Sequence, residues 1–142
     1  MKGTDKQMIW AEKIIAEAEP ALKKGHDRFD SENDSDMRYA WKMVSEEVEE
    51  IISSTVAGYI VERRKSCVDP EGKTMELFEV ITEARKLIDK GEISKESLES
   101  AIEYYEGMLK AIVQCEQRDT VKDNIRNCEL AIWAIDNPKM HE

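Results

Sequence analysis

The sequence predicts an all-α fold, an antiparallel five-helix bundle with a long second helix. Three observations predict it. Apolar residues recur at spacings of three and four along most of the chain, as they do on one face of a helix. The 142 residues include only six Gly and three Pro, and 37% of them are charged, which is typical of long amphipathic helices. This length fits one domain, residues 1–142, with a core of its own.

The first helix is expected to begin at a capping box. The hydroxyl of Thr4 can accept from the backbone N–H of Gln7, whose side chain can reach back to Thr4. Apolar residues then follow at helical spacing: Met8, Ala11, Ile15, Ala18 and Leu22. Pro20 lacks a backbone donor, so we expect a kink or break near Glu19. Gly25 is where we expect the helix to end.

The next stretch, residues 26–36, reads HDRFDSENDSD and predicts a flexible acidic loop. The helix after it, about residues 36–65, is predicted to be the longest. Its apolar stripe consists of Met37, Trp41, Val44, Val48, Ile51, Thr55 and Tyr59. The triplet Arg63-Arg64-Lys65 would complement the negative end of the helix dipole. Residues 68–72 are predicted to form a turn.

Three shorter helices are predicted in the second half of the chain. They cover about residues 74–90, a segment from a Ser94 cap to about Gln117, and a segment from about 119 to just before Pro138. Their inward stripes are predicted to be Leu77, Ile81, Ala84 and Ile88; Leu98, Ile102, Tyr105, Leu109 and Ile112; and Val121, Ile125, Cys128, Ile132 and Ile135. Because short turns join these helices, we expect them to be antiparallel neighbours.

Charge and cysteine content narrow the functional classes. Acidic residues outnumber basic ones 31 to 21, for a net charge of −10. Such a chain should repel nucleic acid and suit a partner with a basic surface, although solubility alone also accounts for the charge. Three dispersed Cys and two His do not supply a structural zinc site, so no cofactor is expected. We find no signal peptide and no membrane span, and expect a cytoplasmic protein without a membrane partner.

One group of carboxylates has an enzyme-like spacing. Glu46-Glu47-x-x-Glu50 is followed by Glu76-x-x-Glu79. This resembles the E-E-x-x-E … E-x-x-D pattern of the all-α nucleoside triphosphate pyrophosphohydrolases, which hold Mg²⁺ against the phosphates of a nucleotide. The resemblance implies four metal ligands, Glu47, Glu50, Glu76 and Glu79. Glu79 stands where that family has Asp.

Helical geometry argues against a metal site between these two helices. At ~100° per residue, Glu46 and Glu50 lie nearly opposite Val48, the centre of the apolar stripe, and Glu79 lies nearly opposite Leu77. These acids therefore point mainly outward, as on an ordinary solvated face. We assign no catalytic residue and no metal ligand, and keep a magnesium-dependent pyrophosphohydrolase as an alternative.

Acidic surfaces are better candidates for binding a partner. One set is Glu46, Glu49 and Glu50 on the second helix. The other set is Glu96, Glu99, Glu103 and Glu106, whose spacing of three, four and three places them on one side of the fourth helix. Such a row could imitate a phosphate backbone for a basic groove. It is also what an ordinary surface helix looks like.

The two ends of the chain carry matching Trp-centred segments. The first is KQMIWAEKI, residues 6–14, and the second is ELAIWAIDN, residues 129–137. Both segments have apolar residues outside the predicted core stripe, among them Trp10 and Trp133. The two Trp could be buried against each other or between neighbouring helices, or they could form an exposed face for a partner or a dimer.

These end segments resemble those of small proteins from phages and integrative elements of Firmicutes. The N-terminal pattern there is K-Q-I-x-W-A-E-x-I, and many of these proteins end in a W-W-I-D-N-R-like segment. The present chain has Ile132 for the first Trp, an inserted Ala134, and Pro138 for the Arg. The resemblance implies a mobile-element protein acting on its host, including an anti-defence inhibitor such as an anti-CRISPR.

We therefore expect a non-enzymatic protein-binding accessory protein of a phage or mobile element. Its expected partner is a host nucleic-acid-binding protein with a basic surface, which it would inhibit through its acidic surface without touching nucleic acid itself. The alternatives are the magnesium-dependent pyrophosphohydrolase and a structural helical homodimer.

Overall fold

The computed structural model describes residues 1–112 and 114–139, and its regular elements are all helices, so the all-α class is confirmed. The helices of the described part are α1 (Asp5–Phe29), α2 (Ser35–Ile52), α3 (Ala57–Glu62), α4 (Arg64–Val68), α5 (Pro70–Asp89), α6 (Lys95–Ala111) and α7 (Cys115–Asp136). There are thus seven helices in this part where the sequence predicts five. The chain forms two compact units, Met1–Phe78 and Glu79–Glu142.

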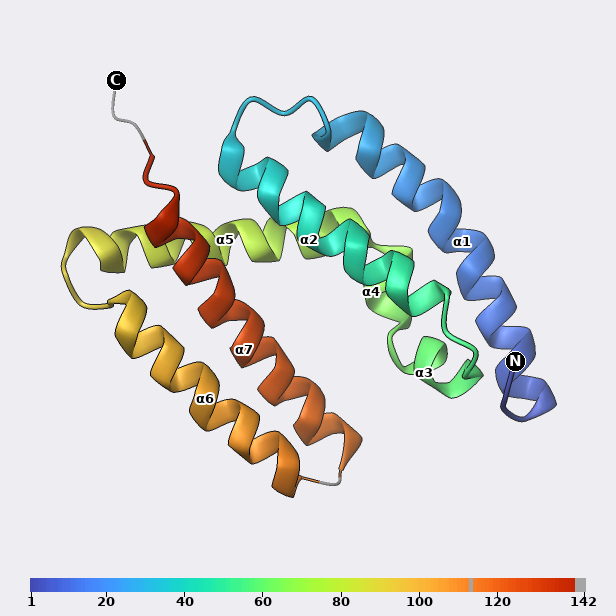
Figure 1. Ribbon diagram of the computed structural model, residues 1–142. Coiled ribbons are helices and arrows are strands. Elements are labelled where there is room, and N and C mark those ends of the chain that lie inside the picture. The colour runs from blue at the N-terminus through green and yellow to red at the C-terminus, as the bar shows by residue number, and fades with distance from the viewer. Residues whose placement is uncertain (113, 140–142) are drawn as a thin grey trace. The chain divides into compact units, whose positions relative to one another are not determined.

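The first unit is organised around α1, which contacts α2, α3 and α4 (Figure 1). The capping box is confirmed: Gln7 N donates to Thr4 Oγ1 (3.1 Å), and Thr4 N donates to Gln7 Oε1 (3.0 Å). Of the predicted kink or break near Glu19, the break is wrong, because α1 continues through Pro20 to Phe29. Pro20 lies on the exposed side, and burial of the opposite side stabilises the helix across it.

The core of the first unit includes Trp41, which is 1% exposed. Its ring stacks on Phe29 with 5.5 Å between centroids, and its Nε1 donates to Asp30 Oδ1 (3.1 Å). Gly25 lies directly against the indole, where a Cβ would come within 2.1 Å of it. Gly25 is therefore a packing position inside α1 and not the predicted helix end. The predicted acidic loop of residues 26–36 shortens to residues 30–34.

The predicted long helix of residues 36–65 is three helices, α2, α3 and α4. After α2, the chain is held away from helical geometry by residues 53–56. Ser54 Oγ accepts from Val56 N (3.1 Å), Lys2 N donates to Thr55 O (2.6 Å), and Ala57 N donates to Lys2 O (2.8 Å). The interruption therefore depends on pairing with the first residues of the chain, which a local pattern does not reveal.

The predicted core stripe of the second helix is confirmed only within α2. Trp41, Val44, Val48 and Ile51 are buried, whereas Thr55 is exposed. α5 begins earlier than predicted, at Pro70, where proline is well suited to the first helical position.

In the second unit, α6 and α7 form an antiparallel hairpin (Figure 1). A second capping box, between Ser94 and Ser97, starts α6 as predicted. Lys95 Nζ lies 3.1 Å from Asp136 Oδ1, joining the start of α6 to the end of α7. The guanidinium of Arg118 donates to Ile112 O (3.0 Å) and to the carbonyl of Leu109, which closes the other end of the hairpin.

The two hairpin helices differ from their predicted bounds and faces. α6 ends at Ala111 and α7 begins at Cys115, both earlier than predicted. Among the described side chains of α7, Val121, Leu130, Ala131 and Ala134 are buried. The other predicted core positions, Ile125, Cys128, Ile132 and Ile135, are only half-buried. The predicted stripe of α6 is only half-buried, and α6 has no fully buried residue.

Candidate protein-binding surfaces

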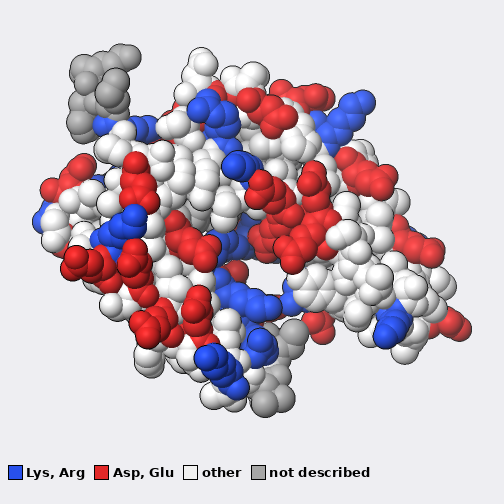
Figure 2. Space-filling model, in the orientation of Figure 1, with Lys and Arg blue, Asp and Glu red and all other residues white. Residues whose placement is uncertain are grey.

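The glutamate row on α6, which we define as Glu96, Glu99, Glu103 and Glu106, is exposed at all four positions. Acidic side chains are prominent over this helix in Figure 2. Among the described residues, none forms an ion pair with a member of the row. Lys110 follows on the same side of α6 near its C-terminus. Four carboxylates therefore face solvent together without an ion-pair partner among the described residues.

The second acidic set is on α2. Glu46, Glu49 and Glu50 are all exposed, and acidic side chains also gather over α2 in Figure 2. Glu49 Oε1 lies 4.0 Å from His26 Nε2, so this set is partly engaged with α1. The glutamate row on α6 is the less constrained of the two acidic surfaces.

The two end tryptophans have different surroundings. Trp10 is 46% exposed, and Lys6 Nζ lies 4.9 Å from the centre of its ring. Trp133 is half-buried, and the Arg85 guanidinium lies 5.7 Å from its ring. Arg85 also donates to Asn137 O (2.9 Å), which fixes the end of α7. Trp10 is therefore not a core residue, and it remains available to a partner.

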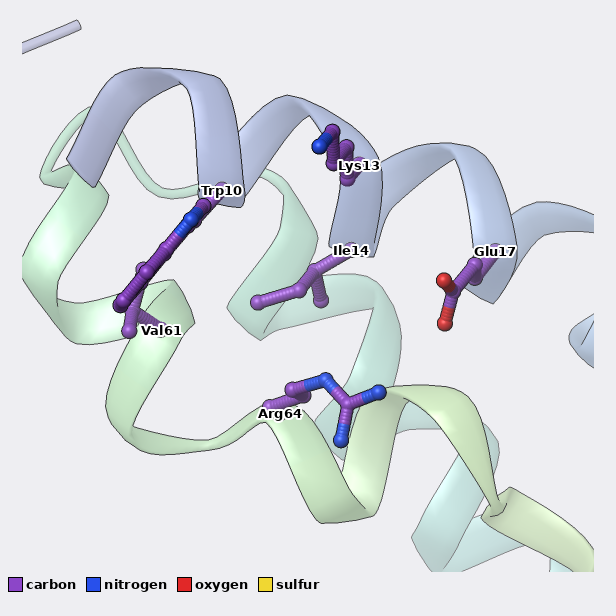
Figure 3. Close-up of a pocket in the computed structure, with 6 residues that line it drawn as sticks. All are labelled: Trp10, Lys13, Ile14, Glu17, Val61 and Arg64. Atoms are coloured by element: carbon purple, nitrogen blue, oxygen red, sulfur yellow. The ribbon is translucent and has the colours of Figure 1, made fainter. Parts of the chain in front are cut away.

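A pocket of about 360 Å³ opens beside Trp10. Its lining residues come from α1, α3 and α4 and are shown in Figure 3: Trp10, Lys13, Ile14, Glu17, Val61 and Arg64. The sequence pointed to Trp10 but not to the pocket. The sequence predicts that Val61 and Arg64 belong to one long helix. It does not predict the interruption at residues 53–56, after which both residues lie beside α1.

Three acids of the magnesium alternative, Glu47, Glu50 and Glu76, belong to the first unit, and Glu79 belongs to the second. Glu50, Glu76 and Glu79 are exposed, and Glu76 pairs with Lys73 (3.6 Å) and Lys65 (3.9 Å). In the described part of the chain, no group of three or more His, Cys, Asp or Glu is placed to hold a metal ion.

The thiols of Cys67 and Cys128 are in surroundings that disfavour the thiolate, the nucleophilic form. Burial raises the pKa of the Cys67 thiol to about 11, with the charge of Glu47 adding to the effect and that of Arg63 opposing it. The pKa of Cys128 is also raised, first by burial and then by Glu129. Thiols whose pKa is raised remain protonated near neutral pH and are therefore weakly nucleophilic.

The two histidines do not add a nucleophilic pair to these thiols. His26 Nδ1 lies 3.0 Å from Asp30 Oδ2 and next to the buried indole of Trp41. It therefore contributes to the packing of α1 against α2. His141 is outside the described residues.

No helix among the described residues has both the length and the apolar character needed to cross a membrane. Comparisons of the chain with protein-family models, curated proteins and solved structures found no match.

Proposed function

We propose that this chain is a non-enzymatic protein-binding protein of a phage or mobile element, and that it inhibits a host nucleic-acid-binding protein through the glutamate row on α6. The observation that carries the proposal is the presence, on one side of one helix, of four exposed carboxylates that form no ion pair with any described residue. The resemblance of the end segments supplies the biological setting.

The spacing of the row suits a groove that binds phosphates. From Glu96 to Glu106 the helix rises about 15 Å, at ~1.5 Å per residue. The four charges are therefore about 5 Å apart on average, compared with about 3.4 Å of axis per phosphate along one strand of a duplex. Lys and Arg side chains are long enough to follow either spacing. A basic groove that binds phosphates could therefore bind these carboxylates in their place.

Salt sensitivity should distinguish this mode of binding. Exposed charges are screened over about 8 Å at physiological ionic strength. Complementary charge across an interface also acts strongly on the association rate. The proposed complex should therefore form fastest at low salt and be competed away by nucleic acid.

The test compares two charge-matched quadruple variants in a pull-down from a Firmicute host lysate at low salt. The first is E96Q/E99Q/E103Q/E106Q. The second, E12Q/E19Q/D27N/E129Q, neutralises four exposed acids elsewhere and changes the net charge equally. We expect wild type and the second variant to recover nucleic-acid-binding proteins that added DNA releases, and the first variant to lose them. Recovery of none by wild type, or equal recovery by both variants, would contradict the proposal.

A further inference from the structure

The pocket beside Trp10 is separate from the glutamate row, because all its lining residues belong to α1, α3 and α4. Its volume of about 360 Å³ is at the small end of the range of about 300–1,000 Å³ for ligand pockets. Such a space accommodates one ring system with a short substituent. It is small for an extended protein segment.

The first part of the pocket is apolar. Figure 3 shows the Trp10 ring reaching from α1 toward Val61 on α3, with Ile14 next along α1. Ile14 is buried and Val61 is half-buried, while Trp10 keeps 46% of its surface exposed. An indole face is attractive to an aromatic ring, which can stack on it or meet it edge to face. This wall therefore favours a planar apolar group.

The second part of the pocket is predominantly cationic. The side chain of Arg64 runs along α4 below Ile14 and Glu17 in Figure 3, and Lys13 lies on α1 between Trp10 and Glu17. Lys6, one turn before Trp10, places its Nζ over the Trp10 ring, 4.9 Å from the ring centre. Among the described residues, Glu17 is the one acid that lines the pocket. In a chain with a net charge of −10, this is a local excess of positive charge.

The cations of the pocket are also free to bind. The neighbours of Arg64 are engaged: Arg63 stacks on Tyr59 at 3.7 Å, and Lys65 pairs with Glu76. Within the described residues, no ion pair involves Arg64 or Lys13. A guanidinium has a planar set of donors that matches a carboxylate or phosphate.

We propose that this pocket binds a small organic anion that carries an aromatic ring. The ring lies against Trp10 and Val61, and the carboxylate or phosphate binds Arg64 with support from Lys13. Glu17 disfavours a second negative charge at the far end of the pocket.

The test uses three probes that share one ring: indole-3-acetate, neutral indole and cationic tryptamine. Binding is followed by NMR through the indole N–H signal of Trp10, with those of Trp41 and Trp133 as internal references. We expect indole-3-acetate to shift the Trp10 signal selectively and to bind at least about tenfold more tightly than tryptamine. Indole should fall between them.

Variants then assign the two parts of the pocket. Arg64→Gln should reduce the preference for indole-3-acetate over tryptamine to about twofold or less. Trp10→Ala should weaken binding of indole-3-acetate at least tenfold, observed through calorimetry because the reporter is lost. Lys23→Gln, which removes an exposed charge on α1 away from the pocket, should leave affinity unchanged. Circular dichroism checks that each variant is folded.

Three results would overturn the proposal. They are the absence of a Trp10 shift at about 10 mM indole-3-acetate, equal affinity for the three probes, and unchanged preference in Arg64→Gln. A fourth is tenfold tighter binding of the tripeptide acetyl-Glu-Trp-Glu-amide, which would make the occupant a protein segment. None of these results bears on the glutamate row, so the two proposals fail independently.

Discussion

Trp41 and Gly25 show at the residue scale how packing overrides a local signal. Glycine often ends a helix, and the sequence alone predicted that Gly25 does so. In the structure, Gly25 is inside α1 and is buried against the Trp41 indole. The sequence shows that residue 25 is small. It does not show that this leaves room for the Trp41 ring of α2, because that contact exists only once the two helices have packed together.

Gly25→Ala should destabilise the protein by about 1–3 kcal/mol, because the added Cβ would lie 2.1–2.7 Å from three atoms of a buried ring. This outweighs the gain of up to about 1 kcal/mol in helix propensity. Gly107→Ala is the matched control. Its Cβ meets nothing within 4 Å, so it should stabilise α6 by up to about 1 kcal/mol. Chemical denaturation measures both changes, and equal effects of the two substitutions would contradict the packing argument.

Cys67 should make stability depend on alkaline pH. Because burial favours the protonated thiol, folding retains this proton up to a pKa of about 11, compared with 9.0 for an ordinary thiol. The stabilisation is complete below about pH 9 and is lost as the pH rises toward 11. At about 1.4 kcal/mol per pKa unit, the loss approaches 2–3 kcal/mol. Chemical denaturation between pH 8 and 11 should show that the free energy of unfolding declines more steeply with pH for wild type than for Cys67→Ala. Parallel plots of this free energy against pH would contradict the prediction.

At the scale of elements, the two helix starts that carry a capping box were predictable, and the interruption after α2 was not. Thr4 and Ser94 begin their helices as expected, because a capping box is made within four consecutive residues. The end of α2 depends on backbone bonds from Lys2 to residues 55 and 57, and this contact is distant in sequence. The buried face of α7 likewise includes Leu130 and Ala131, which periodicity alone placed outside the core.

α6 should be among the first helices to open. None of its residues is fully buried, whereas α2 buries Trp41, Val44, Val48 and Ile51. Local opening free energy follows buried apolar contact. Hydrogen exchange of the intact chain should therefore show protection factors in α6 at least about tenfold below those in α2. Equal protection of α6 and α2 would mean that the half-buried stripe of α6 is enough to hold it.

At the scale of the whole molecule, the sequence gives the net charge directly, but it predicts only part of the distribution of charge over the surface. The row from Glu96 to Glu106 follows from helical spacing within one segment and is exposed as its pattern indicated. The cationic pocket requires residues 10–17 to meet residues 61–64, and that meeting depends on the reversal between α2 and α3. A net charge of −10 does not indicate that the chain has a cavity lined by cations.

The pairing of Lys2 with Thr55 and Ala57 has a consequence for proteolysis of this segment. Met1 is exposed and lies outside the paired backbone, so cleavage of the peptide bond after Met1 would break neither hydrogen bond. Removal of Lys2 would break both and leave the N–H of buried Ala57 without its acceptor. Gly3, with φ of 150° and a Cβ position only 3.0 Å from the side chains of Ala57 and Gln7, reinforces the same boundary. Proteases acting on the folded protein should accordingly spare the bonds on both sides of Lys2.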